Sequence, residues 1–381
     1  MISTRASEIR PFIVMDVLEK AQELERAGEH IIHLEVGEPD FDTPRCIAAA
    51  GERALQQGMT HYTHSQGLLE LRQAICEHYA RQYQVSISPE RVIVTSGTSP
   101  AMLLVFGTLL EKGDEIIISN PHYPCYPNCI HFVGGKTVAI PVEAEDGFQY
   151  RSEDIRSRLS SRTKGILVNS PANPTGNLLE EERLAAIAHM GPVVISDEIY
   201  HGLVYEGKAQ SILQFNDNSF VLNGFSKLYA MTGWRLGYLI APEQFIRPMQ
   251  KIQQNFFISV NTAAQIAGIE ALTSPEAARE VERMKSIYDE RRRYMIRRLK
   301  DMGFGIAVEP TGAFYILADA RKFSGDSYRF AFDILHRAKV GVAPGIDFGS
   351  RAEGYLRFTY ANSLENIAEG MDRLEHYLQS L

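Results

Sequence analysis

The sequence predicts an α/β fold: a mainly parallel sheet with helices on both faces, joined to a smaller α+β domain. Through the middle of the 381-residue chain, short apolar runs rich in β-branched residues alternate with longer helical patterns. These runs are apolar almost throughout, as expected for strands that helices cover on both faces. From about Ala277 the alternation stops and a long charged helix follows, which indicates a second, smaller domain.

Six runs are predicted to be buried strands: Val92 to Thr95, Glu115 to Ser119, Gly165 to Asn169, Val193 to Ser196, Phe220 to Asn223 and Leu236 to Ile240. Two helical stretches between them, Ala101 to Leu110 and Leu179 to Met190, are followed by Gly113 and Gly191. Glycine just beyond a helix is a common stop signal. This order of elements favours a parallel sheet.

The chain is expected to divide into three parts, residues 1–40, 41–276 and 277–381. The first is an N-terminal segment whose helix, around Val14 to Ala27, packs with the small C-terminal domain. The second is the large domain that holds the sheet. The third has a charged helix, Glu280 to Met302, and strands near Ala313 to Leu317 and Tyr355 to Tyr360.

Charge and hydropathy argue against several classes of function. The chain has 39 Lys and Arg against 47 Asp and Glu, a formal net charge of −8, and no basic stripe that would bind nucleic acid. The longest apolar runs are strand-sized, too short to cross a bilayer. Residues 1–10 lack the apolar core of a signal peptide. We therefore expect a cytoplasmic protein without nucleic-acid or membrane partners.

The cysteines and paired histidines do not predict a disulfide framework or a metal site. Four cysteines (Cys46, Cys76, Cys125 and Cys129) are too few for a disulfide framework in a chain of this size, so we expect reduced thiols. The H-x-x-H pairs at residues 30 and 33 and at residues 61 and 64 lack the partners of a zinc site. We interpret them as surface or packing histidines and predict no metal.

Lys227 is the first candidate for covalent chemistry. It follows the predicted strand Phe220 to Asn223, where a buried lysine is unfavourable unless it is paired or used. A desolvated lysine is partly unprotonated, and this is what attack on a carbonyl carbon requires. Taken alone, the Ser226-Lys227 dipeptide would be weak evidence, and a lysine in a structural ion pair would be the better interpretation.

Three further segments each follow a predicted strand. Ser96 to Pro100 (S-G-T-S-P) leads into a helix, so it is either an anion site or an ordinary N-cap. Asn169 to Gly176 (N-S-P-A-N-P-T-G) forms a rigid loop in which Asn173 could face a ligand, or else a plain turn. Ser196 to Tyr200 (S-D-E-I-Y) has neighbouring carboxylates, Asp197 and Glu198, which should point to opposite faces of a strand.

All of these segments lie at the carboxyl ends of predicted strands, the edge where open α/β sheets bind their ligands. Together with other segments they resemble the class I/II aminotransferases, pyridoxal-phosphate enzymes of fold type I. Six segments match in the order of that family and span nearly the whole chain: Glu35 to Asp40, Pro121 to Tyr123, Asn173 to Gly176, Ser196 to Tyr200, Ser226 to Lys227 with Gly233 to Arg235, and Leu356 to Phe358. The resemblance implies a seven-stranded type of sheet and pyridoxal 5′-phosphate as cofactor.

The resemblance also assigns residues to the cofactor ring. Lys227 would bind the cofactor covalently and afterwards act as general base and acid. Asp197 would keep the pyridine nitrogen protonated, so that the ring can accept electrons. Tyr200 and Asn173 would bond the phenolic oxygen, and Tyr123 would stack on the ring. Lys227, Asp197 and Tyr200 are thus the predicted catalytic residues.

The remaining assignments concern the phosphate, the substrate and the dimer. The phosphate would lie on Gly97, Thr98 and Ser99 at a helix start, with Ser226 and Arg235 adding charge-assisted bonds. Substrate would be bound by Gly37, by Asn173 and by the bidentate guanidinium of Arg357. By the same resemblance, Tyr62 would reach the phosphate of a second subunit, which makes the expected active form a homodimer.

Two positions depart from the pattern of the family. Gly224 stands where many relatives have a hydroxyl residue for the phosphate, so we expect one contact fewer, or Ser226 alone. The N-terminal segment reads Pro11-Phe12-Ile13-Val14 instead of the usual Pro-Ser-x-Thr. Substrate assignments taken from relatives therefore do not transfer directly.

The predicted reaction is transfer of an amino group from an L-α-amino acid to a 2-oxo acid, with 2-oxoglutarate as the expected acceptor. An apolar or aromatic donor should be favoured over aspartate, because the expected pocket wall lacks a cation. To admit glutamate, Arg5 or Arg10 would have to swing in. One alternative is a carbon–sulfur β-lyase on the same scaffold. Another is a non-enzymatic regulator, for which residues 1–36 are too few to form a DNA-binding module.

Overall fold

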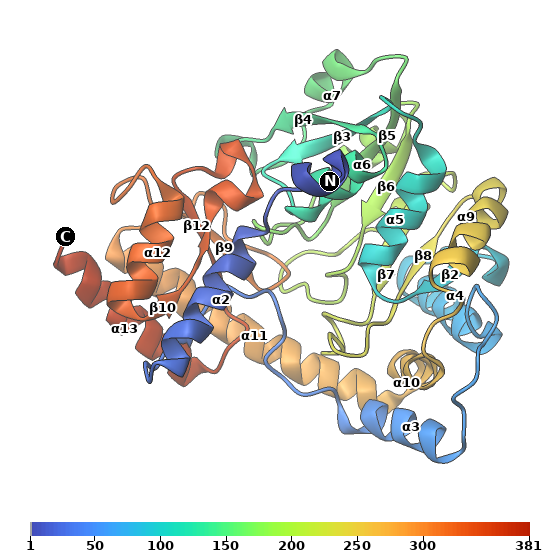
Figure 1. Cartoon of the computed structure of the whole chain (residues 1–381), viewed down its shortest axis with the longest axis horizontal. Coiled ribbons are helices and arrows are strands. Elements are labelled where there is room, and N and C mark those ends of the chain that lie inside the picture. Colours follow the sequence, from blue (N-terminus) through green and yellow to red (C-terminus); the bar gives the residue numbers. More distant parts are fainter. Residues whose placement is uncertain (1) are drawn as a thin grey trace.

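The computed structural model describes residues 2–381 and contains a seven-stranded sheet with helices on both of its faces (Figure 1). Met1, at the start of the predicted N-terminal segment, lies outside the described residues. Neighbouring strands from β4 across to β7 pair in parallel, and β8 is antiparallel to both of its neighbours. In spatial order the strands are β2 (Val92–Thr95), β8 (Gly237–Ile240), β7 (Phe220–Gly224), β6 (Val193–Asp197), β5 (Thr163–Asn169), β3 (Glu115–Asn120) and β4 (Lys136–Pro141).

Alternate residues along the strands of this sheet face different layers of helices. On β2, Val92 and Val94 belong to one apolar core and Ile93 to another. The core around Ile93 is completed by α5 (Thr98–Leu109), α6 (Cys125–Phe132) and α9 (Glu243–Phe256). The opposite core is completed by α3 (Arg45–Gln56), α4 (Leu69–Tyr83), α7 (Ser152–Arg158), α8 (Glu181–Ala188) and α10 (Thr262–Thr273). The predicted strands, covered on both faces, are confirmed.

The edge strand β4 was not predicted. Of its six residues, K-T-V-A-I-P, only Ile140 is fully buried. Because this edge is largely uncovered, β4 has no continuous apolar run by which to recognise it, whereas β2 at the other edge is buried throughout.

A second core lies around a three-stranded antiparallel sheet. Its strands are β9 (Tyr315–Asp319), β12 (Tyr355–Thr359) and β11 (Ala343–Pro344), and two helices pack on them, α12 (Ser327–Ala338) and α13 (Leu364–Gln379). The charged helix α11 (Pro275–Met302) starts five residues before the predicted Glu280. It ends at Gly303, whose φ is 96°. Its first turns pack in the core of the large sheet and its later turns in the second core, so α11 connects the two (Figure 1).

The N-terminal segment returns to the C-terminal part of the chain. After α1 (Thr4–Glu8), helix α2 (Ile13–Arg26) lies against α12 and β10 (Figure 1). Strand β1 (Ile32–His33) pairs in parallel with β10 (Val340–Gly341). The first turn of α2 has no capping side chain of its own. Instead Asp347 accepts hydrogen bonds from the backbone N–H groups of Ile13 and Val14, both at 3.1 Å.

None of the helices formed by residues 2–381 is both long and apolar enough to cross a membrane.

Candidate active site

The predicted site residues gather where the carboxyl ends of the strands meet the second core. Asp197 ends β6, the loop after β5 carries Asn173, and Lys227 lies three residues beyond β7. Arg357 reaches the same place from β12 of the second core. Segments that are far apart in the sequence thus carry the predicted site residues to one edge of the large sheet.

Lys227 is half-buried and contacts the main chain of another predicted site residue. Its Nζ donates a 2.6 Å hydrogen bond to the carbonyl oxygen of Gly37, and it lies 6.0 Å from the centre of the Phe314 ring. Loss of hydration lowers the pKa of Lys227 to about 8. A useful fraction of this amine is therefore an unprotonated nucleophile near neutral pH.

Asp197 is buried, and both of its carboxylate oxygens are hydrogen-bonded. The Tyr126 hydroxyl donates to Oδ2 at 2.6 Å, and the backbone N–H of Ile199 donates to Oδ1 at 3.2 Å. Burial raises the pKa of Asp197 to about 6, although the two donors act in the opposite direction. Asp197 therefore remains mostly ionised at neutral pH inside an apolar site, ready to pair with a cation.

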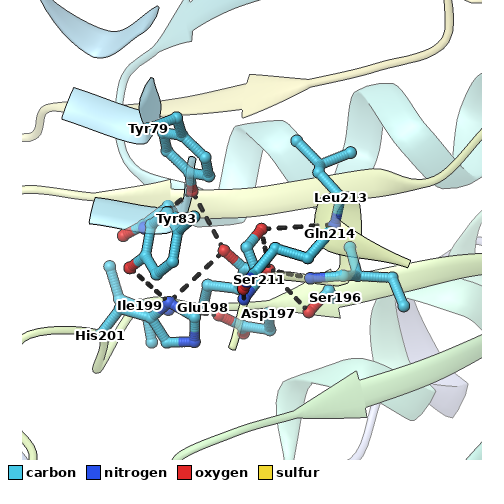
Figure 2. Close-up of polar contacts among 12 residues, drawn as sticks. Tyr79, Tyr83, Ser196, Asp197, Glu198, Ile199, His201, Ser211, Leu213 and Gln214 are labelled. Atoms are coloured by element: carbon cyan, nitrogen blue, oxygen red, sulfur yellow. Dashed lines mark hydrogen bonds and ion pairs between the residues drawn. The ribbon is translucent and has the colours of Figure 1, made fainter. Parts of the chain in front are cut away.

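Glu198 points away from Asp197, to the face of the sheet covered by α4, as predicted for neighbours on a strand. Figure 2 shows Glu198 at the centre of a separate polar network. Oε2 accepts from the Tyr79 hydroxyl at 3.1 Å. Oε1 accepts from two serine hydroxyls and one backbone N–H, those of Ser196 (3.1 Å), Ser211 (3.0 Å) and Ile212 (3.0 Å). Glu198 therefore anchors the end of β6 and does not act as a second acid in the site.

Four tyrosines and a phenylalanine form the aromatic part of the site. The hydroxyl of Tyr200 lies 2.8 Å from that of Tyr315. The ring of Tyr123 packs edge-on against Tyr126, with centroids 5.3 Å apart, and against Phe12 at 6.0 Å. The N-terminal segment therefore contacts the aromatic residue predicted to stack on a cofactor.

Arg357 is 2% exposed and lies between two aromatic rings. Its guanidinium carbon lies 4.3 Å from the centre of the Tyr315 ring and 4.8 Å from that of Phe348. Nη1 donates to the side-chain oxygen of Asn173 at 3.0 Å, and Nη2 donates to the carbonyl oxygen of Glu35. Within residues 2–381 its buried Nε has no hydrogen-bond partner. A buried cation with an unused donor is suited to bind a carboxylate.

The predicted phosphate end combines a helix start with an arginine. Gly97, with φ of 95°, precedes α5, which begins at Thr98 and continues through Ser99. A Cβ at Gly97 would lie 2.6 Å from Nη2 of Arg235, so the guanidinium reaches directly over the glycine. Ser226 lies two residues beyond the end of β7. Free N–H groups beside an exposed guanidinium favour an anion.

Gly224 has a packing reason for lacking a hydroxyl side chain. It pairs with Gly237 across β7 and β8, and a Cβ at Gly224 would lie 3.0 Å from the Cα of Gly237. Any larger residue here would push the two strands apart.

Tyr62 is a predicted site residue that the single chain leaves in the open, with 81% of its surface exposed. It lies in the segment before α4. The hydroxyl of Thr262 donates to the carbonyl oxygen of the preceding residue, His61, at 2.8 Å. Within one chain, Tyr62 is therefore not buried in the site.

Tyr126, Tyr315 and the contact of Phe12 with the site were not predicted. Aromatic residues on helices and strands are most often core residues, and both tyrosines are buried as core residues are. The acceptor role of the Glu35 carbonyl has no signal in the sequence.

The residues present fit pyridoxal 5′-phosphate. A partly unprotonated lysine suits an aldehyde carbon, and a buried carboxylate bonded only to neutral donors suits a protonated pyridine nitrogen. The glycine and arginine at the start of α5 suit a phosphate.

Known proteins resemble the chain over nearly its whole length. The family model described as aminotransferase class I and II matches residues 29–374. A (5-formylfuran-3-yl)methyl phosphate transaminase from Methanocaldococcus jannaschii is 42% identical over 381 residues, covering 99% of this chain and 100% of the relative. Aromatic-amino-acid aminotransferase 2 from Thermococcus litoralis is 35% identical over 387 residues, covering 99% and 98%. The solved structure of aspartate aminotransferase from Thermus thermophilus with maleate is 38% identical, with a TM-score of 0.95 and 99% of each chain covered.

Proposed function

Because the chain belongs to the class I and II aminotransferase family, we propose that it transfers the amino group of an apolar or aromatic L-α-amino acid to 2-oxoglutarate. It is a transaminase that depends on pyridoxal 5′-phosphate and acts on small molecules. The donor preference, the acceptor and the roles of individual residues are the proposal.

The proposed mechanism rests on the contacts of three side chains. When bound, the cofactor withdraws electrons from the α-carbon of the substrate and so makes its proton acidic. Lys227 would hold the cofactor covalently, and its amine, which its lowered pKa leaves partly unprotonated, would take up that proton. Asp197, held in place by Tyr126, would pair with the protonated ring nitrogen of the bound cofactor. Arg357 orients the substrate by its α-carboxylate.

Other residues would hold the cofactor in register. Tyr123 would cover one face of the ring, and Tyr200 and Asn173 would bond its phenolic oxygen. The phosphate would take the N–H groups at Gly97, Thr98 and Ser99, with Ser226 and Arg235 beside them. Gly37 would help to bind the substrate, as a residue whose backbone lies in the site.

The donor preference is supported by the wall that the N-terminal segment contributes. Phe12 lies against Tyr123, and the start of α5 contributes Thr98 and Ser99, neither of which is a cation. Arg10 is held on α6, where its main chain bonds the side chain of Asn128 in both directions, at 3.3 and 3.2 Å. An apolar wall selects by size at roughly 1–3 kcal/mol per methylene, and a desolvated second carboxylate would lack a partner.

The preference is tested by kcat/KM for phenylalanine, leucine, methionine and aspartate with 2-oxoglutarate as acceptor. We expect the best apolar or aromatic donor to exceed aspartate by at least about tenfold. A preference for aspartate would contradict it and would show that Arg5, Arg10 or another cation reaches the pocket. The products also separate the two reactions: glutamate formed from 2-oxoglutarate indicates transamination, whereas pyruvate and ammonia indicate β-elimination.

The proposed active form is a homodimer in which Tyr62 serves the site of the second copy. The exposed residues Tyr62, Phe256 and Ile258 support this assembly. The segments that carry them are held together by hydrogen bonds, such as that from Gln250 to Ser65 at 2.9 Å. Such a group of exposed apolar residues is typical of an interface.

Two wider expectations also stay proposals. The division at residues 40 and 276 is supported by the separate cores of the large sheet and of the three-stranded sheet, which share α11. A cytoplasmic location is supported by the four cysteines, all of which are free thiols.

A further inference from the structure

His33 lies between two carboxylates that come from different parts of the chain. Its Nδ1 is 2.6 Å from Oε1 of Glu35, and its Nε2 is 3.1 Å from Oε1 of Glu25 on α2. The two ring nitrogens can donate at the same time, one to each carboxylate, only when the imidazole is protonated. The three side chains form what we term the His33 bridge, which joins helix α2 to the chain that enters the active site.

Glu35 is the buried end of this bridge. Its side chain is fully buried, and within residues 2–381 its Oε2 has no hydrogen-bond partner. His33 is therefore its charge partner, and a buried carboxylate that loses such a partner is strongly destabilised. A Cβ at Gly341 of β10 would overlap the carboxylate, so glycine at that position is what leaves room for it.

The main chain at Glu35 and Gly37 contacts two residues of the proposed mechanism. The carbonyl oxygen of Glu35 accepts from Nη2 of Arg357, and that of Gly37 accepts from Nζ of Lys227 at 2.6 Å. The residue before Glu35 is fixed by two neighbouring strands. The N–H of Leu34 donates to the carbonyl oxygen of Gly341 at 3.0 Å, and its carbonyl oxygen accepts from the N–H of Thr359 at 2.9 Å. A shift of the Glu35 side chain would be passed to the carbonyl that orients the guanidinium.

The other end of the bridge reaches the substrate side through α2. This helix starts at Ile13, directly after Phe12, whose ring contacts Tyr123. Asp347 fixes the same first turn by two hydrogen bonds. Glu25, near the end of α2, thus connects the helix that carries the pocket wall with the segment that orients Arg357.

We propose that His33 and Glu35 are positioning residues for the substrate: their ion pair fixes the main chain of residues 35–37 and thereby the direction of the Arg357 guanidinium. This rests on the proposed role of Arg357 as the site of the α-carboxylate. Removing the pair should weaken carboxylate binding and leave the covalent attachment of the cofactor intact.

The test uses the holoenzyme and the variants Glu35→Gln, His33→Gln and Glu25→Gln. Two quantities are measured: KM and kcat for the best amino donor, and the Kd of 3-phenylpropionate, a carboxylate without an amino group, from the absorbance of the bound cofactor. We expect Glu35→Gln to raise KM and Kd together by about five- to tenfold while kcat stays within about twofold. His33→Gln should do the same to a smaller extent and Glu25→Gln least, and His33→Gln should add little in the Glu35→Gln background.

Glu29→Gln is the matched control. Glu29 pairs with Lys339 at 2.9 Å, at the same junction between the end of α2 and β10, but it does not contact Glu35. This variant should change neither KM nor Kd. Because Glu25 is exposed, Glu25→Gln and Glu29→Gln remain comparable even if Glu35→Gln fails to fold.

The outcomes separate this inference from the proposed function. If the bridge variants unfold more easily but bind 3-phenylpropionate as the unmodified enzyme does, the pair is merely structural and the inference is wrong. Arg357→Lys, measured in parallel, tests the assignment on which it rests. If Arg357→Lys weakens binding of 3-phenylpropionate strongly and Glu35→Gln does not, the role of the His33 bridge is wrong but that of Arg357 stands. If Arg357→Lys leaves KM unchanged, both the role of Arg357 and that of the bridge are wrong.

Discussion

Lys227 and Asp197 are both displaced from their usual pKa by the same cause, burial, but in opposite directions. Loss of hydration disfavours the ammonium of Lys227, whose pKa falls to about 8, and the carboxylate of Asp197, whose pKa rises to about 6. Both groups therefore titrate close to neutral pH. At that pH the amine is partly available as a nucleophile while the carboxylate is still mostly charged, which is the combination that the chemistry requires.

Asp197→Asn tests the charge at this position through two opposite effects. Turnover should fall at least about a hundredfold, because a neutral amide does not hold a proton on the ring nitrogen. The cofactor-free protein should be more stable at pH 7, by up to about 2–3 kcal/mol, since the ionised carboxylate is buried at a cost. The measurements are kcat and denaturant unfolding with and without the substitution.

The pH dependence of this effect has a definite sign. The pKa of folded Asp197, about 6, lies above its usual value of 3.8. Its contribution to stability is therefore complete below about pH 4 and is lost as the pH rises through 6. The increase in the free energy of unfolding caused by Asp197→Asn should therefore develop as the pH rises from about 4 to 6. Near-normal turnover in this variant would refute the role of Asp197.

At the scale of the element, the alternation of strands and helices was enough to predict the large sheet. All six predicted strands are present, because these strands are largely apolar and helices cover them on both faces. The reversed direction of β8 was not predictable, since an apolar run does not encode its direction. The edge strand β4 lacked the apolar run itself.

The same limit applies to the site. The residues after strand ends, such as Lys227, Asp197 and Asn173, could be named because turn and motif residues stand out from the apolar runs. Tyr126 and Tyr315 could not be named, because the sequence does not distinguish a buried tyrosine of the apolar core from one whose hydroxyl bonds a site residue. Contacts through main-chain carbonyls, such as that of Glu35 with Arg357, depend on tertiary structure alone.

The junction of α2 with β1 should be stabilised by protonated His33. Its carboxylate partners raise the pKa of His33 from 6.5 to about 9. The stabilisation is then complete below pH 6.5 and is lost as the pH rises through 9. We expect His33→Gln to lower the free energy of unfolding by about 2–3 kcal/mol at pH 6. The difference should largely vanish at pH 10 when both proteins are unfolded in denaturant. A loss that is equal at both pH values would mean that packing, and not charge, accounts for the effect.

For the whole molecule, the single chain contains nearly all of the predicted cofactor contacts, and Tyr62 is the exception. Lys227, Asp197, Asn173 and Arg357 converge within one chain, whereas Tyr62 is exposed, as are Phe256 and Ile258. A second copy that covers this surface would remove its apolar side chains from water and supply the missing hydroxyl.

We therefore expect sedimentation velocity to show a dimer. Tyr62→Phe should weaken retention of the cofactor without dissociating the dimer. The phenylalanine ring preserves the apolar contact and removes only the hydroxyl. Tyr328→Phe, at an exposed tyrosine of α12, is the matched control and should have no effect on the affinity for pyridoxal phosphate. A fully active monomer would contradict a shared site.

Covalent labelling shows whether Lys227 carries the cofactor. Borohydride reduction of the purified holoenzyme, followed by digestion and peptide mass spectrometry, identifies the lysine that holds the pyridoxyl phosphate group. We expect one labelled peptide, containing Lys227, and loss of both the label and the yellow colour in Lys227→Ala. Labelling of a different lysine, or a Lys227→Ala protein that keeps its cofactor absorbance, would contradict it.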